Sequence, residues 1–113
     1  MTIQGLSGSV SALKAFGTKM ASTADNIANS QSKKFKKTRV VLSEQQGGTG
    51  GVKAEVSKVN TPGYVDSDNE ELSNVDMAEE ISSMIPTSRN FEANVKTVQT
   101  MDEMTGTIIN IVE

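Results

Sequence analysis

The chain has 113 residues, of which 35% are hydrophobic and only 4% are aromatic, and its formal net charge is −3 at pH 7. It contains no Cys, no His and no Trp, which excludes disulfides, thiolate metal sites, cysteine nucleophiles and the commonest general base. Because few large apolar groups are available for a central core, we expect one domain whose stability depends partly on partners.

The start of the chain carries no cationic segment followed by a continuous apolar block, so we expect no cleavable signal peptide. No stretch approaches the ~18 apolar residues that span a bilayer. We therefore expect no direct membrane insertion.

Residues 3–28 predict an amphipathic helix, because apolar and small residues recur there in alternating steps of three and four, as in a heptad seam. The seam comprises Ile3, Leu6, Val10, Leu13, Gly17, Met20, Ala24 and Ile27, and Phe16 widens it. Each glycine in this segment lowers helix stability by on the order of 1 kcal/mol relative to Ala. We expect this helix to form mainly through packing.

Residues 31–72 predict a small β-rich insertion. Residues 35–42 are β-prone, and residues 52–59 alternate apolar and polar side chains, as a strand with one buried face does. The glycine-rich run 47–51 between them predicts a hairpin loop, and Asn60-Thr61-Pro62-Gly63 predicts a turn. An isolated hairpin is only marginally stable, so we expect it to lean on the helices or on a neighbour.

Residues 73–113 predict a second helix, which begins at Ser73 or Asn74 because either can cap it. Its apolar residues again follow three- and four-residue steps. Pro86 lies inside this pattern and predicts a kink or a split.

The predicted fold is mainly α, with the N- and C-terminal helices packed as a coiled-coil-like hairpin and a small β-hairpin inserted between them. The terminal helical domain is predicted to comprise residues 1–30 and 73–113, and the insertion residues 31–72. From periodicity alone, a helical hairpin within one monomer is the preferred interpretation of the two seams. The candidate packing residues are Leu6, Val10, Leu13, Phe16, Met20, Ile27, Ile81, Met84, Ile85, Phe91, Val95, Val98, Met101, Ile108 and Ile109.

Charge is unevenly distributed. A basic run extends over residues 33–39, whereas residues 59–88 contain seven carboxylates and no basic side chain. Two hypotheses remain open: two separate solvated surfaces, or complementary faces on neighbouring copies that guide register.

Chemical functions have weak support. The acidic segment 66–70 lacks the Gly and Glu spacing of an EF-hand loop, and the glycine-rich run lacks the Gly-Lys-Ser/Thr ending of a phosphate loop. The basic run contains a single aromatic residue in an acidic chain, which disfavours nucleic-acid binding. Ser and Thr have no His partner. We therefore expect no enzyme activity, no metal, no cofactor and no nucleic-acid partner.

Two segments carry a family resemblance. Residues 21–29, Ala-Ser-Thr-Ala-Asp-Asn-Ile-Ala-Asn, resemble the N-terminal signature of flagellar rod and hook proteins, whose core is Asn-Ile-Ala-Asn. The C-terminal half is similar to the FlgC family of proximal rod proteins, through Asn-Val-Asp-Met at 74–77 and Ser-Arg-Asn-Phe-Glu-Ala-Asn at 88–94. The chain is shorter than is usual in that family. The polar signature positions are Asn26, Asn29, Arg89 and Asn94, for which bridging between subunits and local capping both remain open.

The resemblance implies a structural subunit of the bacterial flagellar basal-body rod that assembles helically through its terminal helices into a torque-transmitting drive shaft. It implies packing between chains in addition to packing within one. It also implies export through the flagellar type III apparatus to the periplasmic rod. The implied partners are further copies, other rod proteins, the export apparatus and the basal-body adaptor. The alternative, of a different class, is a small soluble helical adaptor or chaperone-like module.

Overall fold

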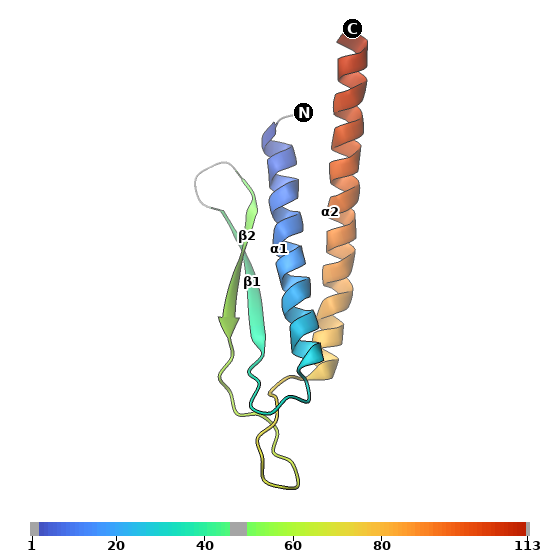
Figure 1. Cartoon of the computed structure of the whole chain (residues 1–113). Coiled ribbons are helices and arrows are strands. Elements are labelled where there is room, and N and C mark those ends of the chain that lie inside the picture. The colour runs from blue at the N-terminus through green and yellow to red at the C-terminus, as the bar shows by residue number, and fades with distance from the viewer. Residues whose placement is uncertain (1–2, 46–49, 113) are drawn as a thin grey trace.

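The computed structural model describes residues 3–45 and 50–112. The elements follow in the order α1 (Ile3–Ala28), β1 (Thr38–Glu44), β2 (Val52–Lys58) and α2 (Met77–Val112). The molecule is a rod of 72 × 26 × 16 Å (Figure 1). Its radius of gyration is 19.1 Å, against about 13 Å for a compact domain of this length.

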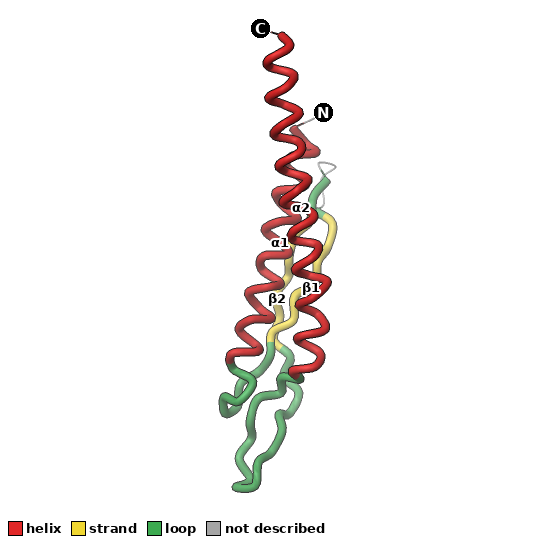
Figure 2. The backbone as a smooth tube through the Cα atoms, turned by 90° about the vertical axis from the view of Figure 1, so that its right-hand side faces the viewer, coloured by secondary structure: helices red, strands yellow, loops and turns green. Residues whose placement is uncertain are grey.

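Helix α1 is the central element of this rod. It runs antiparallel to α2, and both chain ends lie at the same end of the molecule (Figures 1 and 2). One side of α1 packs on α2 and the other side packs on both strands. The predicted fold class, mainly α with a β-hairpin, is therefore confirmed. The predicted domain boundaries remain a prediction.

The start of α2 differs from the sequence prediction. The helix begins at Met77 rather than at Ser73 or Asn74. Asp76 is its cap, since its Oδ1 accepts from the backbone N–H of Ala78 at 3.0 Å and of Glu79 at 3.4 Å. Asn74 instead holds together the segments that flank the strands.

The expected split at Pro86 is also absent, because α2 runs through this residue as one helix. Pro86 is exposed, and so is Ser82, whose carbonyl loses its usual N–H partner. Water can satisfy a carbonyl on an exposed helix face, which makes the proline tolerable there. On the next residue, the buried Thr87 donates its Oγ1 hydrogen to the Ser83 carbonyl at 2.7 Å.

Strands β1 and β2 form an antiparallel hairpin in the register Thr38↔Lys58 to Glu44↔Val52. Of the predicted glycine-rich loop, residues 47–49 lie outside the described residues, and Gly50 and Gly51 have φ values of 69° and 116°. Those angles favour glycine. A Cβ on Gly51 would also lie 2.9 Å from Ser11 Oγ, so glycine lets the hairpin approach α1.

The segment between β2 and α2 folds back on itself at the foot of the rod (Figure 1). Leu72 N–H donates to the Tyr64 carbonyl at 2.6 Å, and Val65 forms a bridge with Glu71. A Cβ on Gly63 would lie only 2.0 Å from the Leu72 carbonyl oxygen. The fold therefore requires glycine at position 63, where the two backbone segments cross.

The two charged segments contact each other within one chain, so the hypothesis of two separate solvated surfaces is wrong. The hypothesis of complementary faces on neighbouring copies stays a prediction. Their ion pairs are Lys33–Glu70, Lys36–Glu71, Lys37–Glu79 and Arg39–Glu79. The folded-back loop and the first turn of α2 bring the carboxylates alongside residues 33–39. Charge complementarity is thus used to close the fold.

Candidate functional site

Few apolar side chains are buried among the described residues. Among the described residues, the buried apolar ones are Ala12, Ala15 and Val75, and the largest fully buried side chains are the polar Asn26, Thr87 and Ser73. The accessible surface is 7666 Å², against about 6000 Å² for a typical monomeric protein of this mass. The chain alone therefore leaves unusually much apolar surface exposed to water.

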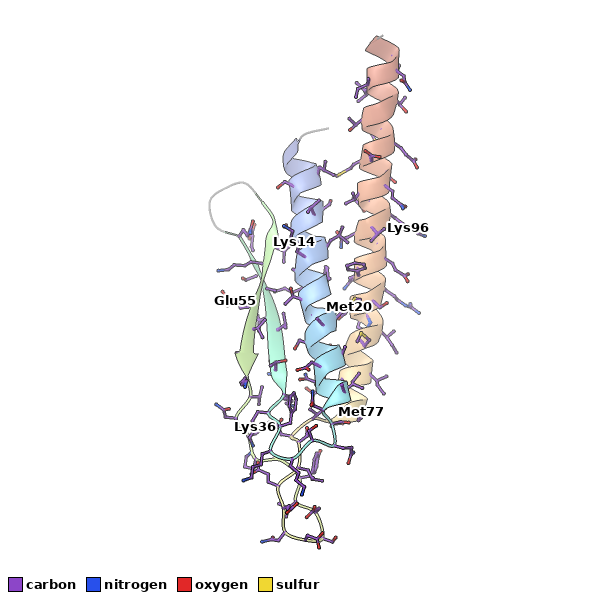
Figure 3. The ribbon with its side chains drawn as sticks, in the orientation of Figure 1. Lys14, Met20, Lys36, Glu55, Met77 and Lys96 are labelled. Carbon is purple, nitrogen blue, oxygen red and sulfur yellow. The ribbon has the colours of Figure 1, made fainter. Side chains whose placement is uncertain are left out.

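Part of the predicted set lies half-buried along the two helices. Phe91 lies over Gly17, where an added Cβ would meet its Cε2 at 3.8 Å, and Figure 3 shows Met20 between the helices. These half-buried residues are Leu13, Phe16, Met20, Ile27, Met84, Phe91, Val95, Val98 and Met101. Each still has apolar surface accessible to solvent.

The rest of the predicted set is exposed. Leu6 and Val10 are 38% accessible on α1, and the four isoleucines of the predicted set on α2 are between 49% and 55% accessible: Ile81, Ile85, Ile108 and Ile109. The structure adds exposed apolar residues that the predicted set omitted, namely Met77, Met104 and Ile111 on α2 and Val41, Val56, Tyr64 and Val65 elsewhere. Met77 begins a stripe with Ile81 and Ile85 at four-residue steps, a spacing that could have identified it.

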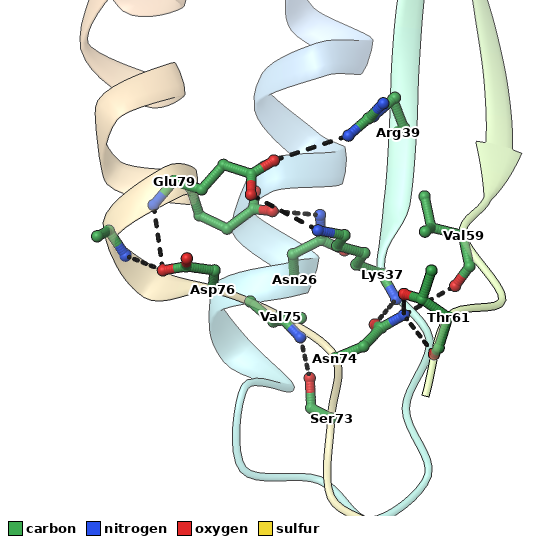
Figure 4. Close-up of polar contacts among 12 residues, drawn as sticks. Asn26, Lys37, Arg39, Val59, Thr61, Ser73, Asn74, Val75, Asp76 and Glu79 are labelled. Carbon is green, nitrogen blue, oxygen red and sulfur yellow. Dashed lines mark hydrogen bonds and ion pairs between the residues drawn. The ribbon is translucent and has the colours of Figure 1, made fainter. Parts of the chain in front are cut away.

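The signature residue Asn26 is the centre of a buried polar network, and Figure 4 shows its contact with the first turn of α2. Its Oδ1 accepts from Thr38 N–H at 3.0 Å, and its Nδ2 donates to the Thr38 carbonyl at 2.9 Å and to Glu80 Oε1 at 3.2 Å. Asn26 is 1% exposed and Glu80 7%. One amide thus joins the end of α1, the first residue of β1 and the first turn of α2.

Asn74 likewise joins segments that are distant in sequence, at the lower ends of the two strands. Its Oδ1 accepts from Lys37 N–H at 2.7 Å, and its Nδ2 donates to the carbonyls of Val59 at 2.8 Å and Thr61 at 3.1 Å (Figure 4). These contacts continue the hairpin ladder beyond the strand ends. The sequence predicts only a capping role for Asn74, because the partners of its side chain are distant in sequence.

The other signature positions make local contacts or none. Asn29 donates to the Asp25 carbonyl at 3.0 Å, and Asn94 donates to the Asn90 carbonyl at 2.8 Å. Arg89 is exposed and forms no ion pair with any residue of the described part of the chain.

Electrostatics near the foot of the rod depend on Glu71. The pKa of this carboxyl lies below its usual value because Lys36 donates a hydrogen bond to it, and Gly63 N–H does so at 3.0 Å. The ion-paired residues Lys37, Arg39 and Glu79 line a separate polar hollow of 210 Å³ between α1, β1 and α2. No cluster of three potential metal ligands occurs among residues 3–45 and 50–112.

Neither helix, over its described length, has an apolar window long enough to cross a membrane.

Comparison with known proteins is informative for the C-terminal segment. Residues 65–111 match the family described as flagellar basal body rod FlgEFG protein C-terminal. The flagellar hook protein FlgE of Escherichia coli is 39% identical over 41 residues, and that of Treponema pallidum is 42% identical over 41 residues. These stretches cover 36% of this chain and 10% and 9% of the two relatives, so the chain spans about a tenth of the length of the hook proteins it matches. The C-terminal segment of this chain is therefore similar to the C-terminal region of flagellar basal-body rod and hook proteins.

Proposed function

We propose that this chain is a structural subunit of the flagellar basal-body rod, which assembles helically through its terminal helices and transmits torque. The observation that carries the proposal is that Val75 is the only buried apolar side chain larger than alanine among the described residues, in a molecule 72 Å long. At about 25 cal/mol per Å² of apolar surface removed from water, covering these faces supplies a substantial driving force for assembly.

The distribution of the exposed groups supports assembly rather than one discrete partner. The outer stripe of Met77, Ile81 and Ile85 lies near the foot of α2, whereas Ile108 and Ile109 lie near its far end. Apolar surface therefore occurs along nearly the whole rod. A helical adaptor would need one patch for one partner helix, while a subunit in a tube wall contacts neighbours along its length.

The proposed partners are further copies of this chain, other rod proteins, the type III export apparatus and the basal-body adaptor. The proposed location is the periplasmic rod, reached without a cleavable signal peptide. The FlgC type is part of this proposal, resting on the Asn-Val-Asp-Met and Ser-Arg-Asn-Phe-Glu-Ala-Asn segments. The role is mechanical, and no catalytic step belongs to it.

Deleting the gene and imaging isolated basal bodies tests the proposal. The expected result is basal bodies that lack a completed rod and hook, in cells that do not swim, with both defects restored by the intact gene. Complete rods and normal swimming after deletion would contradict it. Soluble expression with no association with basal bodies would favour the adaptor.

A further inference from the structure

A groove lies between α1 and β2, on the side of α1 that faces the hairpin. Its volume is about 400 Å³, and it extends along α1 from Ser7 to Thr18, roughly 16 Å at 1.5 Å per residue. Its apolar lining comes from Val10 and Ala15 on α1 and from Val52 and Ala54 on β2, with Lys14 and Lys53 beside them.

A hydrogen bond holds β2 against α1 beside the groove, and the groove is lined by a lysine without an ion-pair partner in the part of the chain that the structure describes. Val52 N–H donates to Ser11 Oγ at 3.0 Å, which holds the start of β2 against α1. Lys14 is exposed and is in no ion pair within the described ranges. Lys53 pairs only with Glu55 across exposed surface, a pair that contributes little. The groove therefore favours an apolar segment that carries a carboxylate.

The end of α2 has these properties. Fourteen residues of α1 precede Gly17, whereas 21 residues of α2 follow Phe91, its neighbour, so α2 extends about seven residues beyond α1 (Figure 1). That is roughly 10 Å at 1.5 Å per residue. Met104, Ile108 and Ile111 are 50%, 51% and 78% accessible there, and Glu103 is exposed without an ion pair among the described residues.

The spacing of this tail fits a groove. Met104, Ile108 and Ile111 follow the i, i+4, i+7 pattern with which one helix face enters an apolar groove. The tail of the same chain cannot enter, because α2 packs on the opposite side of α1 from the hairpin (Figure 1). The occupant must come from another chain.

We infer that the tail of α2 of one copy docks in the groove between α1 and β2 of a second copy, with Glu103 beside Lys14. Groove and tail are different surfaces, so a single contact leaves one groove and one tail free, and further copies can add to them. This inference rests on the proposed self-assembly and names the surfaces it would use.

Disulfide trapping tests the contact, because the chain has no Cys of its own. A variant with Met104→Cys is mixed, under mild oxidation, with a size-tagged variant that carries Ala54→Cys. The matched controls are Glu55→Cys, whose side chain lies on the opposite face of β2, and Lys96→Cys, which precedes the tail (Figure 3). Sedimentation of the same samples, kept reduced, measures self-association separately.

The expected result is about tenfold more mixed disulfide for the Ala54–Met104 pair than for either control pair, since docking raises the local thiol concentration. Lys14→Glu in the groove partner should reduce the yield, and Glu103→Lys in the tail partner should restore it. Self-association with equal trapping at all positions would overturn the docking contact but leave the proposed function standing. Chains that stay monomeric at every concentration would contradict both.

Discussion

Asn26 and Thr38 are joined in both directions: the amide oxygen of Asn26 accepts from Thr38 N–H, and its amide nitrogen donates to the Thr38 carbonyl. The side chain of Asn26 thus occupies the place that a neighbouring strand would have at the free edge of β1. At the free edge of β2, Ser11 Oγ likewise accepts a hydrogen bond from Val52 N–H. Because α1 caps the two strand edges at opposite ends, the twisted hairpin is fixed to the helix.

Replacing Asn26 with Ala should reduce the free energy of unfolding by about 2–4 kcal/mol, because it leaves buried groups of Thr38 and Glu80 without partners. The measurement is chemical denaturation followed by circular dichroism. Asn29→Ala is the control, since its bonds are local and largely exposed, and it should change stability far less. Equal effects of the two substitutions would contradict the role given to Asn26.

Acid should loosen the foot of the rod through Glu71. The folded-state pKa of this carboxyl is lowered by Lys36 and by Gly63 N–H, so its stabilising contribution is present above its usual pKa of 4.5 and is lost as the pH falls through the lowered value. Melting temperatures of the wild type and Glu71→Gln should therefore differ at pH 7 and converge at low pH. Glu92→Gln, on exposed α2 surface, should show no such convergence. A constant difference for Glu71→Gln at every pH would refute this assignment.

Two glycines should respond oppositely to alanine. Gly63→Ala places a Cβ against the Leu72 carbonyl, so the crossing backbones must separate, at a cost of roughly 1–3 kcal/mol. Gly17→Ala brings a Cβ only to ordinary contact with Phe91, and it should raise stability by up to about 1 kcal/mol through helix propensity. Thermal unfolding of both variants measures this, and destabilisation by Gly17→Ala would mean that the helices pack more closely than described.

The helices and the hairpin could be predicted because their patterns are local. The heptad steps of residues 3–28 give α1 its bounds, and the alternation of residues 52–59 gives β2. The face of α1 toward the hairpin could not be recognised in the same way, since Ala12, Ala15, Thr23 and Asn26 are small or polar and lack apolar periodicity. That face is covered by the hairpin, whose strands present half-buried side chains at alternating positions.

The candidate site was predictable to a similar extent. Apolar spacing identified the stripes of both helices, but it could not separate residues between the helices from residues on the outside, because that depends on where α1 lies. The helix start at Asp76 and the pairing of the two charged segments depend on the folded-back loop, whose partners are distant in sequence. The tolerance of Pro86 depends on the exposure of its helix face.

The most direct test asks whether other chains cover the exposed apolar faces. It is sedimentation velocity of the purified chain over a wide concentration range, with Ile85→Asp as the test variant and Gln99→Asp as the control. Ile85 is 55% exposed, so its replacement should leave the helix content of the monomer unchanged. The account predicts that the average sedimentation coefficient rises with concentration for the wild type and Gln99→Asp, and that Ile85→Asp shifts this rise to clearly higher concentration. A wild-type chain that sediments as one rigid monomer throughout, identically to Ile85→Asp, would contradict it.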